Sequence, residues 1–295
     1  MTGNDLHGCG TALVTPFTRD GAVDEPALRA LVDWQIDEGI HYLVPCGSTG
    51  EAATLSLKEH RRVVEIVVDQ GRGRVPIVAG AGSNDTRRAI ELSKEMEAAG
   101  ATHLLHVSPM YNKPPQRGLV AHFRAIADAT RLPIVVYNVP GRTGGNIEAR
   151  TTLELAGVDN IVAVKEASGN LGQITDIIHG RPEGFAVLSG DDSLTLGVMA
   201  AGGDGIISVI SNATPGPMAQ LTECMRDGDI AAARRLHHQL WSWMQTAFIE
   251  SNPIPVKYAL SALGRIQNVL RPPLVPLAGS NESAVRESLR AAGAL

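Results

Sequence analysis

Ile161-Val162-Ala163-Val164-Lys165 is a short, apolar and largely β-branched run that predicts a buried β-strand. Similar runs recur along the chain, bounded by glycine, proline, asparagine or aspartate, and longer segments with helical period separate them. The predicted strands are residues 10–15, 41–46, 75–79, 103–107, 134–138, 161–165, 185–189 and 205–209.

Alternation of strands with helices is typical of a parallel sheet, and strands that are apolar throughout are buried on both faces. The helical segments fit this pattern, since residues 25–38 place Leu28, Leu31 and Ile36 on one stripe. Eight βα units over about 230 residues predict an α/β fold, a closed (β/α)₈ (TIM) barrel. An open doubly wound sheet is the alternative.

The strand signal ends after Ser211, and only helical segments follow. We expect a catalytic barrel at residues 1–228 and a small C-terminal helical domain at residues 229–295. The helices predicted after the last strand are residues 218–225, 230–248, 254–263 and 280–292.

The net charge of −5 argues against nucleic acid or an anionic membrane as a partner, since both require a concentrated positive face. Cys9, Cys46 and Cys224 are odd in number and widely spaced, which is typical of reduced thiols. Residues 1–10 lack the apolar core of a signal peptide, and no run is long enough to span a membrane. We expect a cytoplasmic protein.

The active site of such a barrel forms at the carboxyl ends of its strands, where Lys165 ends an apolar run. The other four lysines lie on charged helical stretches, in a proline-rich loop or in the tail. A lysine directed into the barrel loses hydration, so its pKa falls and its neutral amine can attack a carbonyl. The alternative is a lysine that extends outward or pairs with Glu166.

Tyr137 and Arg142 follow the preceding strand within Tyr137-Asn138-Val139-Pro140-Gly141-Arg142. The Tyr137 hydroxyl is expected at the same mouth as Lys165, where a phenol can transfer protons. Arg142 lies in a glycine-flanked turn, where a guanidinium can hold a carboxylate with two hydrogen bonds. A core tyrosine and a solvated arginine are the structural alternatives.

The turn Gly47-Ser48-Thr49-Gly50-Glu51 has the S-x-x-E spacing of a capping box, which predicts the start of a helix. Free amides at a helix N-terminus also bind anions such as a keto-acid carboxylate, and the Ser48 and Thr49 hydroxyls add donors. Tyr111, in a proline-rich loop, is read from the residues alone as a contact residue. Asp191 and Asp192 are expected to cap a helix rather than to bind a metal.

Histidine spacing argues against a metal-dependent aldolase. His103 and His106 alternate onto opposite faces of one strand, and His237 and His238 diverge on a helix. The glycines near residue 80 lack the third glycine of a dinucleotide fingerprint. We expect neither a metal nor an organic cofactor.

These motifs together resemble the dihydrodipicolinate synthase / N-acetylneuraminate lyase family of class I pyruvate aldolases, over nearly the whole chain. The resemblance rests on residues 47–51 and 137–142, on Val164-Lys165-Glu166-Ala167-Ser168, on residues 189–191 and 205–208, and on residues 250–257 of the tail. Several motifs in the right order are more specific than any one of them. The family fold is a barrel with a helical tail.

The resemblance implies that Lys165 forms the Schiff base with pyruvate and that Tyr137 is the acid and base beside it. Thr49 and Tyr111 would complete a hydroxyl relay, with Tyr111 reaching the neighbouring subunit's site, which implies a homodimer or homotetramer. The remaining residues implied to bind substrate are Ser48, Gly50, Arg142, Gly190 and Ile207.

Arg142 points to the synthase branch of the family, in which an arginine at this place holds the carboxylate of aspartate semialdehyde. Ser48, in contrast, stands where that branch more often has threonine, and matches the lyases. The implied reaction joins pyruvate to aspartate semialdehyde and gives 4-hydroxy-tetrahydrodipicolinate, on the route to diaminopimelate and lysine. The alternatives are another pyruvate-dependent aldolase or lyase, for N-acetylneuraminate, 4-hydroxy-2-oxoglutarate or keto-deoxy sugar acids, and a non-catalytic keto-acid-binding barrel.

Inhibition by lysine is expected to be weak or absent. Lysine-inhibited members bind the effector with histidine, glutamate and tyrosine side chains, where this chain has Leu57, Arg88 and Met110, although His60 and Asn84 are kept. An arginine in place of a carboxylate repels the ammonium group of lysine.

Overall fold

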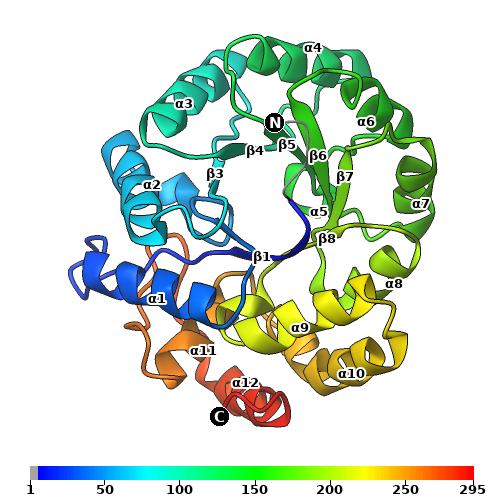
Figure 1. Ribbon diagram of the computed structural model, residues 1–295. Coiled ribbons are helices and arrows are strands. Elements are labelled where there is room, and N and C mark those ends of the chain that lie inside the picture. The colour runs from blue at the N-terminus through cyan, green and yellow to red at the C-terminus, as the bar shows by residue number, and fades with distance from the viewer. Residues whose placement is uncertain (1–5) are drawn as a thin grey trace.

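The apolar runs form parallel strands that close into a barrel (Figure 1). The computed structural model describes residues 6–295, in which eight strands pair in the order β2-β1-β8-β7-β6-β5-β4-β3. The ring closes between β2 and β3, where Leu43 bridges Ile77 and its amide donates to the Pro76 carbonyl at 3.0 Å. The predicted (β/α)₈ barrel is therefore confirmed, and the alternative of an open sheet is wrong. The strands are β1 Gly8–Ala12, β2 Tyr42–Val44, β3 Val78–Gly80, β4 His103–Val107, β5 Ile134–Asn138, β6 Ile161–Glu166, β7 Ala186–Ser189 and β8 Gly205–Ser208.

The helices surround the strands as an outer ring (Figure 1). Their starts follow local sequence signals: Asp24 caps α1, and Ser56 with Glu59 forms a capping box at α2. The barrel helices are α1 Glu25–Asp37, α2 Leu57–Gly71, α3 Thr86–Ala98, α4 Gln116–Ala127, α5 Pro140–Thr143, α6 Ala149–Leu155, α7 Leu171–Gly180, α8 Thr195–Ala200 and α9 Pro215–Arg226. Short 3₁₀ helices are η1 Ala52–Thr54, η2 Asp192–Leu194 and η3 Ile210–Asn212.

The tail consists of α10 Ile230–Thr246, α11 Ile254–Ala262 and α12 Gly279–Ala291, grouped beside α1 and α9 (Figure 1). The fully buried Trp243 anchors it, since its indole N–H donates to the Ile210 carbonyl at 3.3 Å, just after β8. We propose the domain boundary at Gly228, whose positive φ of 82° follows the end of α9.

The first predicted strand is displaced from the observed one. Residues 13–15 are apolar or β-branched but lie beyond the end of β1, where the Val14 amide donates to the Asn212 side chain and Lys257 donates to the Thr15 carbonyl. The Leu13 amide still donates to the Val44 carbonyl of β2 at 3.0 Å, whereas Val14 and Thr15 are held by η3 and the tail and not by the sheet. In contrast, β4 and β5 have their predicted bounds.

The described residues do not include residues 1–5. The first half of residues 1–10, where no signal peptide is predicted, therefore lies outside them. Among residues 6–295 no helix combines the length and apolar character needed to cross a membrane.

Candidate active site

A cavity of about 990 Å³ lies at the carboxyl ends of the strands and extends to the tail. This is the end of a parallel barrel where loops and strand termini bring polar groups together. Among the residues predicted for the site, those that line the cavity are Ser48, Thr49, Tyr137, Arg142, Lys165 and Gly190.

Lys165 is 5% exposed and projects from β6 into this cavity. It pairs in register with Tyr137 of β5, and its Nζ lies 4.3 Å from the centroid of the tyrosine ring. Burial lowers the lysine pKa to about 7; the negative charge of Asp192 opposes this shift and Arg142 adds to it. About half of the amine is therefore neutral near pH 7.

The alternative pairing of Lys165 with Glu166 is excluded by the geometry of β6. The Glu166 carboxylate accepts from Asn138 Nδ2 at 3.0 Å, from Gln173 Nε2 at 3.1 Å and from the Ser168 amide at 2.7 Å. Successive side chains of a strand face opposite sides, so Glu166 holds the outer layer together while Lys165 faces inward.

Tyr137 is buried beside the amine, at the end of β5. Burial raises its pKa to about 12, with a smaller opposing effect from Arg142. The phenol therefore keeps its proton across the neutral range and can both donate and accept hydrogen bonds during proton transfer.

The turn at residues 48–50 departs from the predicted capping box. Its amides at Gly50 and Glu51 donate within the turn to Gly47 and Ser48, and only the short η1 follows. Glu51 instead has a left-handed backbone, and its carboxylate is directed to the tail. The expected start of an α-helix at this turn is therefore wrong, whereas anion binding by the turn stays a prediction, with Ser48 and Thr49 on the cavity wall.

Asn252 of the tail contacts two residues of the site and was given no role from the sequence. Its Nδ2 donates to Thr49 Oγ1 at 2.9 Å, and its carbonyl accepts from Arg142 Nη2 at 3.2 Å. Because Thr49 accepts this bond, its own proton remains available to another acceptor. No local pattern could have shown this, since Asn252 lies 203 residues from Thr49.

Tyr111 is not part of this cavity. Its side chain is 89% exposed, its φ is 71°, and its amide donates to the Thr143 carbonyl at 3.2 Å. The two tyrosines of the implied relay are therefore not brought together within one chain.

Gly50 and Ile207 also lie outside the cavity lining. The Gly50 carbonyl accepts from Thr15 Oγ1 at 2.7 Å, and Ile207 is fully buried in the barrel interior with Tyr137 and Leu188. Gly190 does line the cavity, and a Cβ there would lie 3.1 Å from Lys165 Cε. Gly190 thus gives the lysine stem its room.

Asp191 and Asp192 make different contacts. Asp191 caps η2 by accepting from the Ser193 amide, as expected. Asp192 is buried, and it accepts from Ser208 Oγ and from the Val209 amide at 3.0 Å. Burial raises its pKa to about 6, and the bond from Ser208 opposes this. Within residues 6–295 no three histidine, cysteine, aspartate or glutamate side chains cluster to hold a metal ion.

A buried amine beside a phenol at the mouth of a (β/α)₈ barrel defines the class of Schiff-base-forming lyases. The chain matches the model of the dihydrodipicolinate synthetase family over residues 5–292, and it belongs to that family. It is 50% identical to the 4-hydroxy-tetrahydrodipicolinate synthase of Chloroherpeton thalassium, over 98% of this chain and 96% of the relative. The synthase of Koribacter versatilis is 51% identical, over 98% and 97%. The crystal structure of dihydrodipicolinate synthase from Aquifex aeolicus has a TM-score of 0.95 and 41% identity, over 98% and 99% of the two chains.

These comparisons confirm the predicted family, the barrel with its helical tail, and the assignment to an enzyme of the Schiff-base lyase class. The expectation of the synthase branch is also confirmed, since the relatives above carry that name over nearly their full lengths.

Proposed function

We propose that this chain condenses pyruvate, held as an imine of Lys165, with aspartate semialdehyde to give 4-hydroxy-tetrahydrodipicolinate. One observation carries the proposal: Lys165 is buried at the barrel mouth with a pKa of about 7, and its Nζ lies 4.3 Å from the centroid of the Tyr137 ring. Arg142 at the cavity rim and the names of the relatives support the particular substrates.

In the proposed reaction the neutral Lys165 amine attacks C2 of pyruvate and gives a carbinolamine. Tyr137 donates a proton to the departing hydroxyl, so that water leaves and the imine forms. Loss of a proton from the pyruvate methyl group gives an enamine, whose carbon attacks the aldehyde. The amino group of the second substrate then attacks C2, closes the ring and releases Lys165.

The two carboxylates are assigned to different parts of the cavity. We assign the pyruvate carboxylate to the turn at residues 48–50, where the Ser48 and Thr49 groups line the wall. Arg142 lies at the rim, held by the Asn252 carbonyl, and is assigned to the carboxylate of aspartate semialdehyde. Gly190 gives space beside the amine, and Ile207 supports the pocket floor from the barrel interior.

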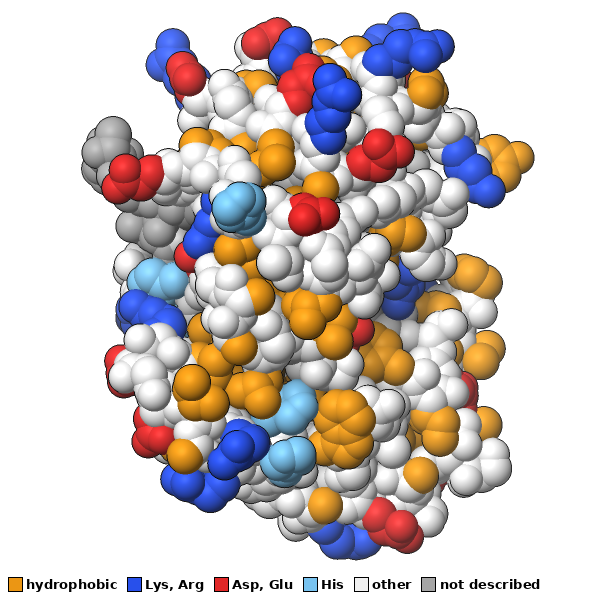
Figure 2. All heavy atoms as spheres, turned by 90° about the vertical axis from the view of Figure 1, so that its right-hand side faces the viewer, with side chains coloured by type: hydrophobic (Ala, Val, Ile, Leu, Met, Phe, Trp, Pro, Cys, Tyr) orange, Lys and Arg blue, Asp and Glu red, His pale blue; other side chains and the backbone are white. Residues whose placement is uncertain are grey.

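The exposure of Tyr111 supports self-association. A tyrosine that is 89% exposed on a loop held to Thr143 is available to a second copy of the chain, where its hydroxyl would join the Thr49–Tyr137 relay. A second face carries hydrophobic side chains between scattered charges (Figure 2). The side chains of Leu171 in α7 and of Ile230 and Trp241 in α10 are exposed as well. We propose a homodimer or homotetramer that acts in the cytoplasm.

The proposal is tested by following condensation of pyruvate with aspartate semialdehyde in a coupled reductase assay. We expect turnover with this pair, and none with N-acetylneuraminate, 4-hydroxy-2-oxoglutarate or a keto-deoxy sugar acid. Lys165→Ala should abolish turnover, whereas Lys94→Ala, on the exposed face of α3, should not. Full activity of Lys165→Ala, or turnover with another aldol pair alone, would contradict the proposal.

A further inference from the structure

Glu51 follows the turn at residues 48–50 and has a left-handed backbone with φ of 52°. This conformation is unfavourable for a residue with a Cβ, so surrounding contacts must hold it. The Glu51 carboxylate is buried and supplies them: it accepts from Lys257 Nζ at 2.6 Å and from the Arg271 amide at 3.0 Å. Both partners belong to the tail.

Lys257 reaches the turn by a second route. Its Nζ also donates to the Thr15 carbonyl at 2.9 Å, and Thr15 Oγ1 donates to the Gly50 carbonyl at 2.7 Å. One fully buried ammonium therefore holds both the Glu51 side chain and, through Thr15, the backbone of Gly50. The Phe17 ring covers it, with its centroid 4.2 Å from Nζ.

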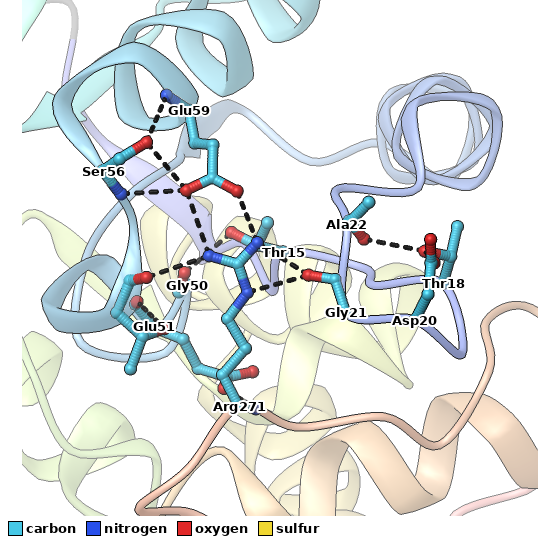
Figure 3. A network of polar contacts seen from close by, with 11 residues as sticks. Thr15, Thr18, Asp20, Gly21, Ala22, Gly50, Glu51, Ser56, Glu59 and Arg271 are labelled. Atoms are coloured by element: carbon cyan, nitrogen blue, oxygen red, sulfur yellow. Dashed lines mark hydrogen bonds and ion pairs between the residues drawn. The ribbon is translucent and has the colours of Figure 1, made fainter.

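Arg271 fixes the chain beyond Glu51 (Figure 3). Its guanidinium donates to the Thr54 carbonyl at 2.9 Å and the Gly21 carbonyl at 2.7 Å, and it pairs with Glu59 of α2. These guanidinium contacts hold η1 and α2, whereas Lys257 bonds to the Glu51 side chain and acts on the Gly50 backbone through Thr15. The Arg271 side chain and the Lys257 side chain thus hold different segments, although the Arg271 amide also bonds to Glu51.

We propose that Lys257 is a positioning residue for the pyruvate carboxylate site, acting through Glu51 and Thr15 on the turn at residues 48–50. This inference rests on the proposed function, which assigns that turn to the carboxylate. Lys257 does not line the cavity, so its effect is transmitted by the turn and not by contact with substrate. Displacing the turn weakens pyruvate binding more than it slows the chemistry at Lys165.

A role in stability alone makes a different prediction. Desolvation offsets much of the attraction in a buried ion pair, so replacing both charges with neutral groups of similar size is often nearly neutral. A pair that only fills the core could thus be neutralised without changing pyruvate binding. The double variant Glu51→Gln/Lys257→Met removes both charges and separates these roles.

The experiment compares Lys257→Met, the double variant and Val285→Ala in the full chain. Val285 is a fully buried apolar residue of α12, so its truncation disturbs the tail core without touching the turn. Steady-state kinetics should show the pyruvate KM raised about 10- to 100-fold in both Lys257 variants. We expect the KM of aspartate semialdehyde to change by about threefold or less, and kcat, which also depends on Thr49 of this turn, to fall by less than the pyruvate KM rises. Val285→Ala should keep the wild-type pyruvate KM at a lower melting temperature.

A folded double variant with the wild-type pyruvate KM would overturn the inference. So would an equal rise in KM for Val285→Ala. If Lys257→Met alone does not fold, the double variant decides, since it leaves no unpaired buried charge. Failure of the proposed function is seen separately, as a wild-type chain that does not turn over pyruvate.

Discussion

The pKa of Lys165 makes the pH dependence of imine formation a quantitative prediction. With a pKa of about 7, half of the amine is neutral at pH 7, whereas an ordinary lysine near 10.5 would be neutral in about one molecule in 3,000. Burial thus raises the reactive fraction by about 10³-fold. Tyr137, with a pKa of about 12, adds no titration in this range.

The assay measures the initial rate of trapping by cyanoborohydride at sub-saturating pyruvate from pH 5 to 10. Below pH 7 the rate should rise about tenfold per pH unit, because the neutral fraction of the Lys165 amine rises by that factor. Above about pH 8 the rate should level off. Asp192 raises the lysine pKa, so Asp192→Asn should move the midpoint to lower pH. Asp176→Asn, an exposed change of the same charge on α7, should leave it in place.

A rate that keeps rising through pH 9 would refute the argument, because it would show an amine that is not desolvated. A midpoint that Asp176→Asn moves as far as Asp192→Asn would refute the assigned role of Asp192.

Three further predictions follow from separate parts of the molecule. Burial lowers the His106 pKa to about 3, so the folded chain binds fewer protons than the unfolded one, and stability is full above pH 6.5 and is lost as the pH falls towards 3. Between pH 7 and 5 the free energy of unfolding should fall by about 2 kcal/mol on this account, and His106→Gln should remove that fall when stability is measured by urea unfolding. A His106→Gln variant whose stability falls with pH as steeply as the wild type would contradict the role given to His106. Tyr111→Phe should keep the fold and lower kcat about 100-fold if its hydroxyl completes a neighbouring site, and wild-type kcat would exclude it from the relay. Micromolar lysine should not inhibit the coupled reaction, because Arg88 repels its ammonium group; strong inhibition would show that another residue supplies the carboxylate.

The fold was predictable because a strand that is buried on both faces consists of consecutive apolar residues, which can be recognised in the sequence. The β5 strand, Ile134–Asn138, has the predicted bounds because it lies inside the ring and every residue of it is buried. Val14 and Thr15 carry the same signal for another reason, since their backbones bond to η3 and the tail, and periodicity cannot distinguish sheet pairing from such packing.

The site was predictable where its chemistry is local. Lys165 stands out because a charge in an apolar strand is rare, and Tyr137 because it ends the neighbouring strand. Asn252 and the Glu51–Lys257 pair were missed because their partners lie more than 200 residues away in the sequence. The contact between Glu51 and Lys257 also explains why Ser48 and Glu51 have the spacing of a capping box but do not form one.

The most direct test of the account is mass spectrometry after incubation with pyruvate and borohydride, with peptide mapping across the five lysines. The account predicts one reduced adduct, on Lys165, because the lysines on α2, on α3 and in the loop after β4 lack its apolar surroundings, and Lys257 is paired with Glu51. A folded protein that remains unmodified, or that carries the adduct on another lysine, would contradict it.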